Sequence, residues 1–567
     1  MRSRITPRVF AVIYLVLCLL GCGGSSKSSS QPPPVITTAT LPTATVGVAY
    51  SQTMAARGVQ PLTWSISSGN LPAGLTVSIA GVISGTPTGT PGTAKFTVTV
   101  ADAENPPAKA TANLSIVVNS AATALFQGNY AFLFSGYFNG YFTGAGSFVA
   151  DGAGNITGGI VDTNGLTGPT INGGFTGTYS IGSNSMGTMN WVFTGPGGGS
   201  STYEVVISSD GGNAQFIQYD SRGVQGAGVI KKQDTSSFSA AQIKGNYAFG
   251  LVGIDGPTAG RMAVAGEFLS DGVSQLSSGL ADDNDNGTLL SSAGLSGSYS
   301  VASSGRGTAV LNISGLGTLN ASFYVISANE FFLMETDTVG ASHPLLSGDV
   351  LQQSGAGSFT DASLNGSSIL EADALASSNP PTPSVTLGLA VVSIPGTLNL
   401  NSDVNSGGTL SNSTEQLTYS VAPDGRVSTT GSAPAVFYLV NANQAFALFS
   451  DSAVTFGSLE PQTAGPFTNA SLSGTYVGNS IILAAPGTTE ADALSADGHG
   501  NLTETFNSSD GTHLQQGTRS LTYATAANGR TVLSTAQNSA AGIVYIVSPL
   551  KAIELGAGNP SLSIFEH

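Results

Sequence analysis

The sequence predicts an all-β protein that is built from several domains. The chain has 567 residues, which is too long for one hydrophobic core. It contains 75 glycines, only 9% charged residues and 41% hydrophobic residues, so it combines many turns with enough apolar side chains to fold. Short runs rich in Val, Thr, Tyr and Phe alternate with Gly-rich corners, and no segment has convincing helical periodicity. These observations favour β-strands that are joined by tight turns.

Charge and cysteine content exclude several kinds of site. The formal net charge is −16, so the chain offers no basic face that could neutralise the phosphates of a nucleic acid. Both cysteines lie in the first 22 residues, which leaves neither a disulfide nor a cysteine-metal site for the folded part. The four histidines are scattered without the spacing of metal ligands. The sequence therefore predicts no metal, no cofactor and no nucleic-acid partner.

The N-terminus has the features of an export signal. Residues 1–21 carry three arginines and then the apolar run VFAVIYLVLCLL, which is too short for a permanent membrane span. The stretch Leu19-Leu20-Gly21-Cys22 resembles a bacterial lipobox, which implies cleavage before Cys22 and attachment of diacylglycerol and palmitate there. Residues 22–34 read as a Gly/Ser/Pro tether. The resemblance implies a lipoprotein at the bacterial outer membrane or cell surface, which contacts the membrane through the lipid on Cys22.

Residues 35–119 form the first folded unit. Phe96, Val98 and Val100 alternate with polar residues and present one apolar face, and Trp64 has the character of a core anchor. The characteristic strings are PLTWSIS (61–67), LPAGL (71–75), GVISGTP (81–87) and GTAKFTVTVAD (92–102). They resemble the bacterial "putative Ig" family, a cadherin-like β-sandwich of surface proteins. The resemblance implies a spacer or adhesive module without catalysis.

The rest of the chain consists of four divergent β repeats. The string GNYAF occurs at 128–132 and again at 245–249. A tyrosine recurs at intervals of 120, 120 and 104 residues, and arginine-containing turn strings follow the last three of these tyrosines. The tyrosines are Tyr179, Tyr299, Tyr419 and Tyr523. We assign the repeats to residues 125–233, 243–353, 364–463 and 472–567.

Each repeat is predicted to form a small up-and-down β-barrel. A repeat offers about eight strand candidates with short Gly-rich corners, and closing such a sheet removes its exposed edges. A Greek-key sandwich is the alternative for the same strands. The complete expected architecture is thus an Ig-like β-sandwich followed by four barrels.

The Asp/Gly/Asn-rich string at 148–165 invites comparison with a metal or phosphate loop. Asp151-Gly152 and Gly154-Asn155 are, however, residues that tight hairpins use because they tolerate a positive φ. The second repeat keeps Asp271-Gly272 but loses the second Gly-Asn pair, and a metal loop would not tolerate this loss. The string is therefore interpreted as a hairpin.

Two other acidic motifs are candidate sites. In DDNDNG (282–287), Asp282, Asn284 and Asn286 match the opening of a calcium loop, but Ala293 stands where the bidentate glutamate belongs. We regard them as a weak calcium candidate. The pentapeptide EADAL occurs at 371–375 and 490–494, and on a strand its Glu and Asp share one face. Such carboxylate pairs could serve glycoside hydrolysis, but they could also be relics of the repeat.

The favoured function is that of a lipid-anchored surface protein with a structural, adhesive or binding role. Its partner would be a carbohydrate or a surface protein. The first alternative is that each barrel holds a small apolar ligand in a lipocalin-like lumen. The second is an extracellular hydrolase, which the absence of a nucleophile elbow and of nucleotide-binding motifs argues against, so no enzyme is predicted.

Overall fold

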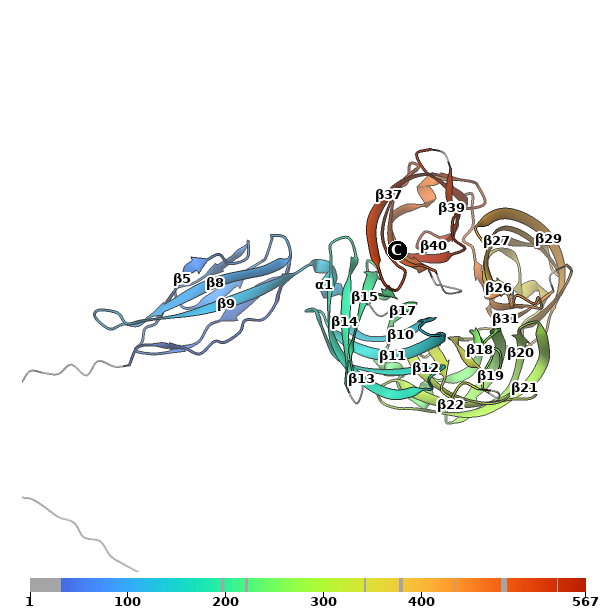
Figure 1. Cartoon of the computed structure of the whole chain (residues 1–567), viewed down its shortest axis with the longest axis horizontal. Helices are drawn as coiled ribbons and strands as arrows, with labels where there is room; N and C mark the ends of the chain where they lie inside the picture. The colour runs from blue at the N-terminus through green and yellow to red at the C-terminus, as the bar shows by residue number, and fades with distance from the viewer. Residues whose placement is uncertain are drawn as a thin grey trace, which may run out of the picture.

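The structure is a computed structural model that describes residues 32–194, 198–219, 223–340, 343–376, 381–432, 434–480, 487–537 and 539–567. Figure 1 shows an elongated N-terminal module and four β-barrels that lie around a common centre. The predicted signal peptide and Cys22 lie outside the described residues. Among the described residues, no helix is both long and apolar enough to cross a membrane. The prediction of an all-β protein is confirmed.

The N-terminal module consists of small, mostly antiparallel β-sheets packed face to face. One sheet has the strand order β2-β9-β8-β5, another has the order β3-β7-β6, and β1 pairs with β4. Trp64 is buried between the sheets, and a Cβ atom on Gly81 would lie only 2.7 Å from its indole ring. The strands are β1 (Val35–Ile36), β2 (Ala44–Thr45), β3 (Tyr50–Thr53), β4 (Ala56–Arg57), β5 (Thr63–Gly69), β6 (Leu75–Val77), β7 (Val82–Gly85), β8 (Gly92–Ala101) and β9 (Lys109–Asn119).

Each of the four repeats is a closed barrel of eight strands. Barrel 1 comprises β10 (Gln127–Tyr137), β11 (Tyr141–Asp151), β12 (Asn155–Gly165), β13 (Thr170–Ile181), β14 (Met186–Thr194), β15 (Ser200–Ile207), β16 (Asn213–Gln218) and β17 (Gln225–Lys232). Barrel 2 comprises β18 (Lys244–Ile254), β19 (Arg261–Asp271), β20 (Gln275–Asp285), β21 (Thr288–Val301), β22 (Arg306–Ile313), β23 (Gly317–Ser327), β24 (Glu330–Glu335) and β25 (Leu345–Gln352).

The last two barrels have the same composition. Barrel 3 comprises β26 (Gly366–Ala376), β27 (Thr382–Ile394), β28 (Thr397–Ser406), β29 (Thr409–Val421), β30 (Arg426–Thr430), β31 (Ala435–Asn441), β32 (Gln444–Phe449) and β33 (Phe456–Pro461). Barrel 4 comprises β34 (Ser473–Ser480), β35 (Thr489–Asp497), β36 (Asn501–Ser509), β37 (Leu514–Thr525), β38 (Arg530–Ser534), β39 (Ala540–Ser548), β40 (Lys551–Gly556) and β41 (Leu562–Glu566).

The barrels have up-and-down topology. Every strand pairs antiparallel with the next one in sequence, and the first strand of each barrel pairs with the last, as β10 does with β17. The predicted barrel is therefore confirmed and the Greek-key alternative is wrong. Closure at this strand number leaves a lumen that side chains can fill.

A short helical turn precedes each barrel and covers one end of its lumen. These turns are α1 (Ala121–Leu125), η1 and η2 (Thr235–Ser237 and Ala240–Gln242), η3 (Asp361–Ser363) and η4 (Asn469–Ser471). The residue that ends each turn accepts a hydrogen bond from the hydroxyl of one of the four recurring tyrosines. The pairs are Tyr179 with Phe126, Tyr299 with Ile243, Tyr419 with Leu364 and Tyr523 with Leu472. The recurring tyrosine thus ties the covering turn to the barrel, and we call the opposite end of the lumen the mouth.

The string at 148–165 is a hairpin, as predicted. Asp151 ends β11, and its carboxylate accepts hydrogen bonds from the backbone N–H groups of Ala153 (2.7 Å) and Asn155 (2.9 Å). Gly152 and Gly154 have φ angles of 74° and 96°, which glycine adopts without strain. The carboxylate therefore stabilises the turn that joins β11 to β12.

The four barrels contact one another in sequence order, and barrel 4 also contacts barrel 1, so they form a ring (Figure 1). At three of the four interfaces, an aspartate from the third strand of one barrel binds an arginine and a tyrosine of the next. In the second interface, Arg426 Nε and Nη2 each donate to the Asp282 carboxylate at 2.7 Å, and the Tyr438 hydroxyl donates to it as well. The three interface triads are Asp162 with Arg306 and Tyr324, Asp282 with Arg426 and Tyr438, and Asp403 with Arg530 and Tyr545.

An asparagine two residues after each triad aspartate adds a second polar contact. Its carboxamide N–H group donates to backbone carbonyls at the end of the seventh strand of the next barrel. Asn284, for example, donates to the carbonyl oxygens of Phe449 (2.8 Å) and Asp451 (2.7 Å). Together the aspartate and the asparagine fix the register of neighbouring barrels.

The interface between barrels 4 and 1 has different chemistry. In register, Met186 and Val206 of barrel 1 occupy the positions that arginine and tyrosine have in the other barrels. They pack with Ile217 and Ala227 against Val477, Ala491 and Ala493 of barrel 4. Asn507 stands at the position of the triad aspartate and donates to Glu204 at 2.7 Å. The ring is therefore closed by an apolar cluster and neighbouring hydrogen bonds, in place of the Asp–Arg–Tyr triad.

Candidate binding site in the lumen of barrel 4

The lumens of the barrels differ at the mouth. Barrel 1 is filled by aromatic rings; Trp191, for example, stacks on Phe175 with centroids 4.7 Å apart. In barrel 4, apolar residues such as Tyr476, Leu494 and Leu521 fill the end near the helical turn. Towards the mouth, the inward positions of the same strands are charged or small. Barrel 4 therefore has a polar pocket where barrel 1 has a packed aromatic core.

Four carboxylates converge in this pocket. Glu490 and Asp492 follow the alternation of β35 and point inward on the same side as Leu494. Glu504 comes from β36 and Glu554 from β40. Ligand oxygens of Glu490, Asp492 and Glu504 all lie within 4.8 Å of one another. We call these four residues, with the arginine described next, the acidic pocket.

Arg519 on β37 is the cation among the residues that line the pocket. Its Nη1 atom lies 2.7 Å from Glu490 Oε1 and 2.9 Å from Glu504 Oε1. Its guanidinium also lies over the ring of Phe506, 3.8 Å from the centroid, which is a cation–π contact. One guanidinium cannot neutralise four carboxylates, so an excess of acidic groups remains in the pocket.

The pKa values of the acidic groups respond to this crowding. Burial raises the pKa of Glu554 to about 8, and the charges of Glu504 and Glu490 contribute to the rise. The pKa of Asp492 is also raised, first by burial and then by its three acidic neighbours. Asp492 is only 3% exposed, and among the described residues its Oδ1 atom has no hydrogen-bond partner. A buried oxygen of this kind is costly unless something binds it.

The acidic pocket has room for a ligand. Its volume is about 450 Å³, in the range of small-molecule sites. Ser480 and Ser563 line it from the first and last strands, and the segment 556–561 borders it. Gly542 leaves space for Glu554, because a Cβ atom at position 542 would lie 2.3 Å from Glu554 Oε1. Carboxylates in such a cavity can bind a metal cation or an ammonium group.

We expect the acidic pocket to make stability depend on pH. Glu554 has a pKa of about 8 in the folded chain and 4.5 as its ordinary value, so the folded state holds the extra proton between these pH values. The contribution of Glu554 to the free energy of unfolding is therefore largest below about pH 4.5. It decreases between pH 4.5 and 8 and is lost above pH 8. Glu554→Gln should remove this dependence and gain about 4 kcal/mol over the parent at pH 8, measured by urea unfolding. Glu104→Gln, in the N-terminal module, is the control, and equal pH profiles for parent and Glu554→Gln would contradict the prediction.

The calcium candidate in barrel 2 has a different role. The carboxylate of Asp282 is bound by Arg426 and Tyr438, and Asn284 contacts the backbone of barrel 3. Asn286 has a φ angle of 47° and lies in the turn after β20. The interpretation as a calcium loop is corrected, because the side chains of Asp282 and Asn284 bind residues of barrel 3 instead.

The two EADAL strings lie on non-equivalent strands. Glu371 and Asp373 are in the first strand of barrel 3, whereas Glu490 and Asp492 are in the second strand of barrel 4. In each string the two acids share one face, as predicted, but the first pair points away from its lumen. There Asp373 pairs with Arg261 of barrel 2. The strings are therefore not relics of one repeat position, and the second one contributes to the acidic pocket.

The lipocalin-like alternative has no support in barrels 1 and 4. Aromatic residues that could have lined an apolar cavity in barrel 1 instead pack against each other. The pocket of barrel 4 is lined by carboxylates rather than by apolar side chains.

The N-terminal module belongs to a known family. Residues 33–119 match the model of the family described as "Putative Ig domain". This match confirms the resemblance seen in the sequence, and it ends before the first barrel begins. Comparison with curated proteins gives no match.

Comparison with solved structures gives weak similarities. One is to the isotype 1 transferrin binding protein B of serogroup B Neisseria meningitidis, with 10% identity and a TM-score of 0.19, covering 59% of this chain and 74% of that one. Another is to the extracellular domain of protocadherin gamma B4, with 10% identity and a TM-score of 0.14, covering 86% of this chain and 66% of that one. Neither similarity is strong enough to indicate a shared architecture over the whole chain.

Proposed function

We propose that the protein is a lipid-anchored bacterial surface protein whose ring of barrels binds a cationic ligand in the acidic pocket. The lipid would be attached at Cys22, and residues 22–34 would hold the folded part away from the outer membrane or cell surface. The Ig-like module would act as a spacer, since it precedes the ring and extends away from it (Figure 1). The ring would be the binding body.

The buried, uncompensated acidity of the pocket carries this proposal. Four carboxylates face one guanidinium, and Asp492 combines 3% exposure with an oxygen that lacks a hydrogen-bond partner among the described residues. A bound cation would replace the missing partner and would lower the raised pKa values of its neighbours. The volume of about 450 Å³ admits an organic ammonium ion as well as a hydrated divalent metal ion.

We propose a binding function and no catalysis. Arg519 Nη1 contacts both Glu490 and Glu504, so these two carboxylates are already paired with a cation within the pocket. The site is the end of a barrel lumen, whereas carboxylates that hydrolyse glycosides flank the bond on two sides of the sugar. A carbohydrate or surface-protein partner that presents an amine would satisfy the same chemistry.

Isothermal titration of the full-length chain with calcium and, separately, with spermidine tests the proposal. We expect saturable binding of at least one of them, and Asp492→Asn should weaken it at least tenfold. Asn has the shape of the neutral aspartic acid, so this variant should fold normally. The matched control is Asp510→Asn, which changes an exposed aspartate in the same barrel.

Two results would contradict the proposal. Binding that is absent, or equal in the parent and in Asp492→Asn, would remove the pocket as a cation site. Hydrolysis of an aryl glycoside that is lost in Glu490→Gln would show that the pocket is catalytic.

A further inference from the structure

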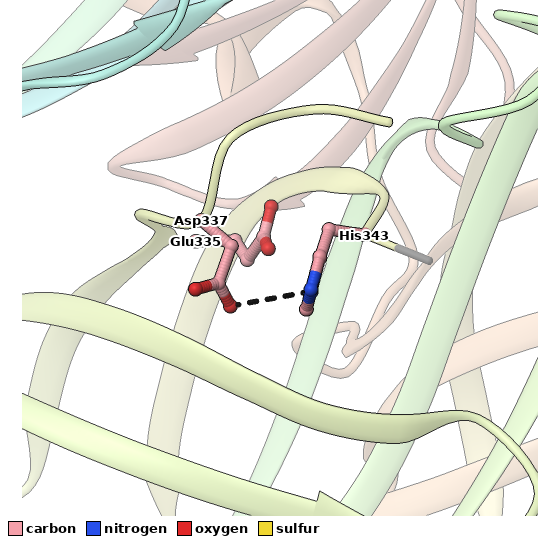
Figure 2. A group of neighbouring side chains, drawn as sticks. All are labelled: Glu335, Asp337 and His343. Atoms are coloured by element: carbon pink, nitrogen blue, oxygen red, sulfur yellow. Dashed lines mark ion pairs between the residues drawn. The ribbon is translucent and has the colours of Figure 1, made fainter. Parts of the chain in front are cut away.

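A second cluster of possible ligands lies at the mouth of barrel 2. Glu335 ends β24, Asp337 follows two residues later, and His343 lies just before β25. Each offers one ligand atom, and these atoms all lie within 4.8 Å of one another. Figure 2 shows the three side chains directed into the same space, with the ion pair between Asp337 Oδ2 and His343 Nδ1 at 3.5 Å. All three residues therefore lie between the end of β24 and the start of β25, and their side chains come together in space.

Glu335 is the unusual member of this cluster. Its side chain is buried, with only 1% of the residue exposed, and neither carboxylate oxygen has a hydrogen-bond partner among the described residues. Burial, assisted by the charge of Asp337, raises its pKa to about 9. Burying a carboxyl group with two unsatisfied oxygens in an apolar lumen lowers the stability of the folded chain.

The fold itself does not require a carboxylate at this position. Asn164 of barrel 1 donates to the backbone carbonyls of Glu335 (3.2 Å) and Asp337 (2.7 Å). In the next barrel, Asn284 makes the same two contacts with Phe449 and Asp451. Phe449 therefore occupies the position of Glu335, and it packs in the apolar core of barrel 3. Barrel 2 thus has a buried acid, Glu335, at the position where barrel 3 forms the same contacts with a buried phenylalanine.

The other two groups are partly accessible and oriented. The side chains of Asp337 and His343 are 18% and 38% exposed, so an ion could reach the cluster from that side. Asn320 holds Asp337 through its backbone N–H and its carboxamide, both at 2.8 Å from the carboxylate oxygens. Such outer contacts orient ligating carboxylates in metal sites.

We propose that Glu335, Asp337 and His343 bind a divalent transition-metal ion, with zinc as the best-fitting case. One imidazole nitrogen and two carboxylate oxygens suit zinc, whereas calcium and magnesium prefer oxygen ligands alone. Zinc–ligand distances of about 2.0–2.2 Å place two ligands at most about 4.4 Å apart, so small side-chain movements complete the site. Water would complete the coordination.

The test is a titration of the metal-stripped, untagged full-length chain with zinc chloride, followed by calorimetry and by thermal denaturation. It is done in the Asp492→Asn background, which weakens the acidic pocket of barrel 4, so that failure of one proposal leaves the other intact. We expect one site, a rise in melting temperature on adding zinc, and no competition from calcium in the same concentration range.

Substitutions separate this site from adventitious binding. Glu335→Gln keeps the shape of the protonated acid and should fold normally, yet it should weaken zinc binding at least 100-fold, as should His343→Asn. The matched control is His513→Asn, which removes an exposed histidine that also lies beside an aspartate, at 3.1 Å from Asp510. Equal affinity of the parent and Glu335→Gln, loss of binding in His513→Asn, or no binding by the parent would each overturn the proposal. The last result would leave Glu335 as a buried acid that its surroundings keep protonated.

Discussion

Asp282→Ala is expected to lower the free energy of unfolding by about 3–5 kcal/mol. The change leaves Arg426 and the Tyr438 hydroxyl without the carboxylate that both bind, at an interface where the Arg426 side chain is only 16% exposed. A buried charge that loses its partner keeps its desolvation cost and loses its compensation. Urea unfolding of the full chain, followed by circular dichroism, measures the effect.

The apolar interface between barrels 4 and 1 suggests how to reverse this loss. Asp282→Asn, Arg426→Met and Tyr438→Val together introduce the residue types found at the closing interface. The triple variant should regain most of the lost stability, because well-packed apolar residues can replace a buried ion pair with little or no net cost. Glu415→Gln, on β29 of barrel 3, is the control and should change stability by less than about 0.5 kcal/mol. A loss below about 1 kcal/mol in Asp282→Ala would show that the triad contributes little.

Cys22→Ala is expected to move nearly all of the protein from the membrane fraction to the soluble fraction. The lipid predicted at Cys22 would carry several acyl chains, each contributing about 0.8 kcal/mol for every buried CH₂ group. Less than about a tenth should stay with membranes after fractionation, and palmitate labelling should disappear.

The chain contains its own control for this experiment. Cys18, the other cysteine, lies in the apolar run of the predicted signal peptide, four residues before Cys22. Cys18→Ala should keep both membrane attachment and palmitate labelling. Unchanged fractionation of Cys22→Ala would refute the lipoprotein assignment.

The barrels could be predicted because their signals are local. Gly-rich corners and alternating strands determine hairpins, and hairpins in sequence order lead to an up-and-down barrel. The recurring tyrosine was visible as a spacing, although its hydrogen bond to the preceding helical turn was not. Asp151 could likewise be assigned to a turn, because its partners lie within four residues of it.

The ring was missed, although the sequence contains a signal for it. The string Asp-x-Asn at 162–164, 282–284 and 403–405 occurs in the first three repeats, whereas Gly-Arg turns occur in the last three. This offset by one repeat is what contacts between successive barrels require. When the offset between the Asp-x-Asn strings and the Gly-Arg turns is not considered, Asp282 and Asn284 resemble the start of a calcium loop. Local spacing alone cannot distinguish a metal ligand from an interface residue.

The two proposed sites could not be located from sequence for a different reason. Glu490 and Glu554 are 64 residues apart, and only the closed barrel brings their strands to one lumen. Which EADAL string points inward depends on the strand that carries it, and a shift of one residue reverses the face. His343 gave no metal-ligand spacing because its partners are carboxylates placed by the bend after β24.

The ring of barrels also has a consequence for the copy number of the repeat. Barrel 1 presents Met186 and Val206 to one neighbour, and barrel 4 presents Val477 and Ala493 in return. If an internal barrel were duplicated or deleted, each barrel could still bind the next one in sequence. The row of barrels would then no longer bring the apolar surfaces of its first and last barrels into contact. Exposed patches of this kind promote aggregation. We therefore expect the gain or loss of a whole barrel to cause more aggregation than a substitution within one barrel.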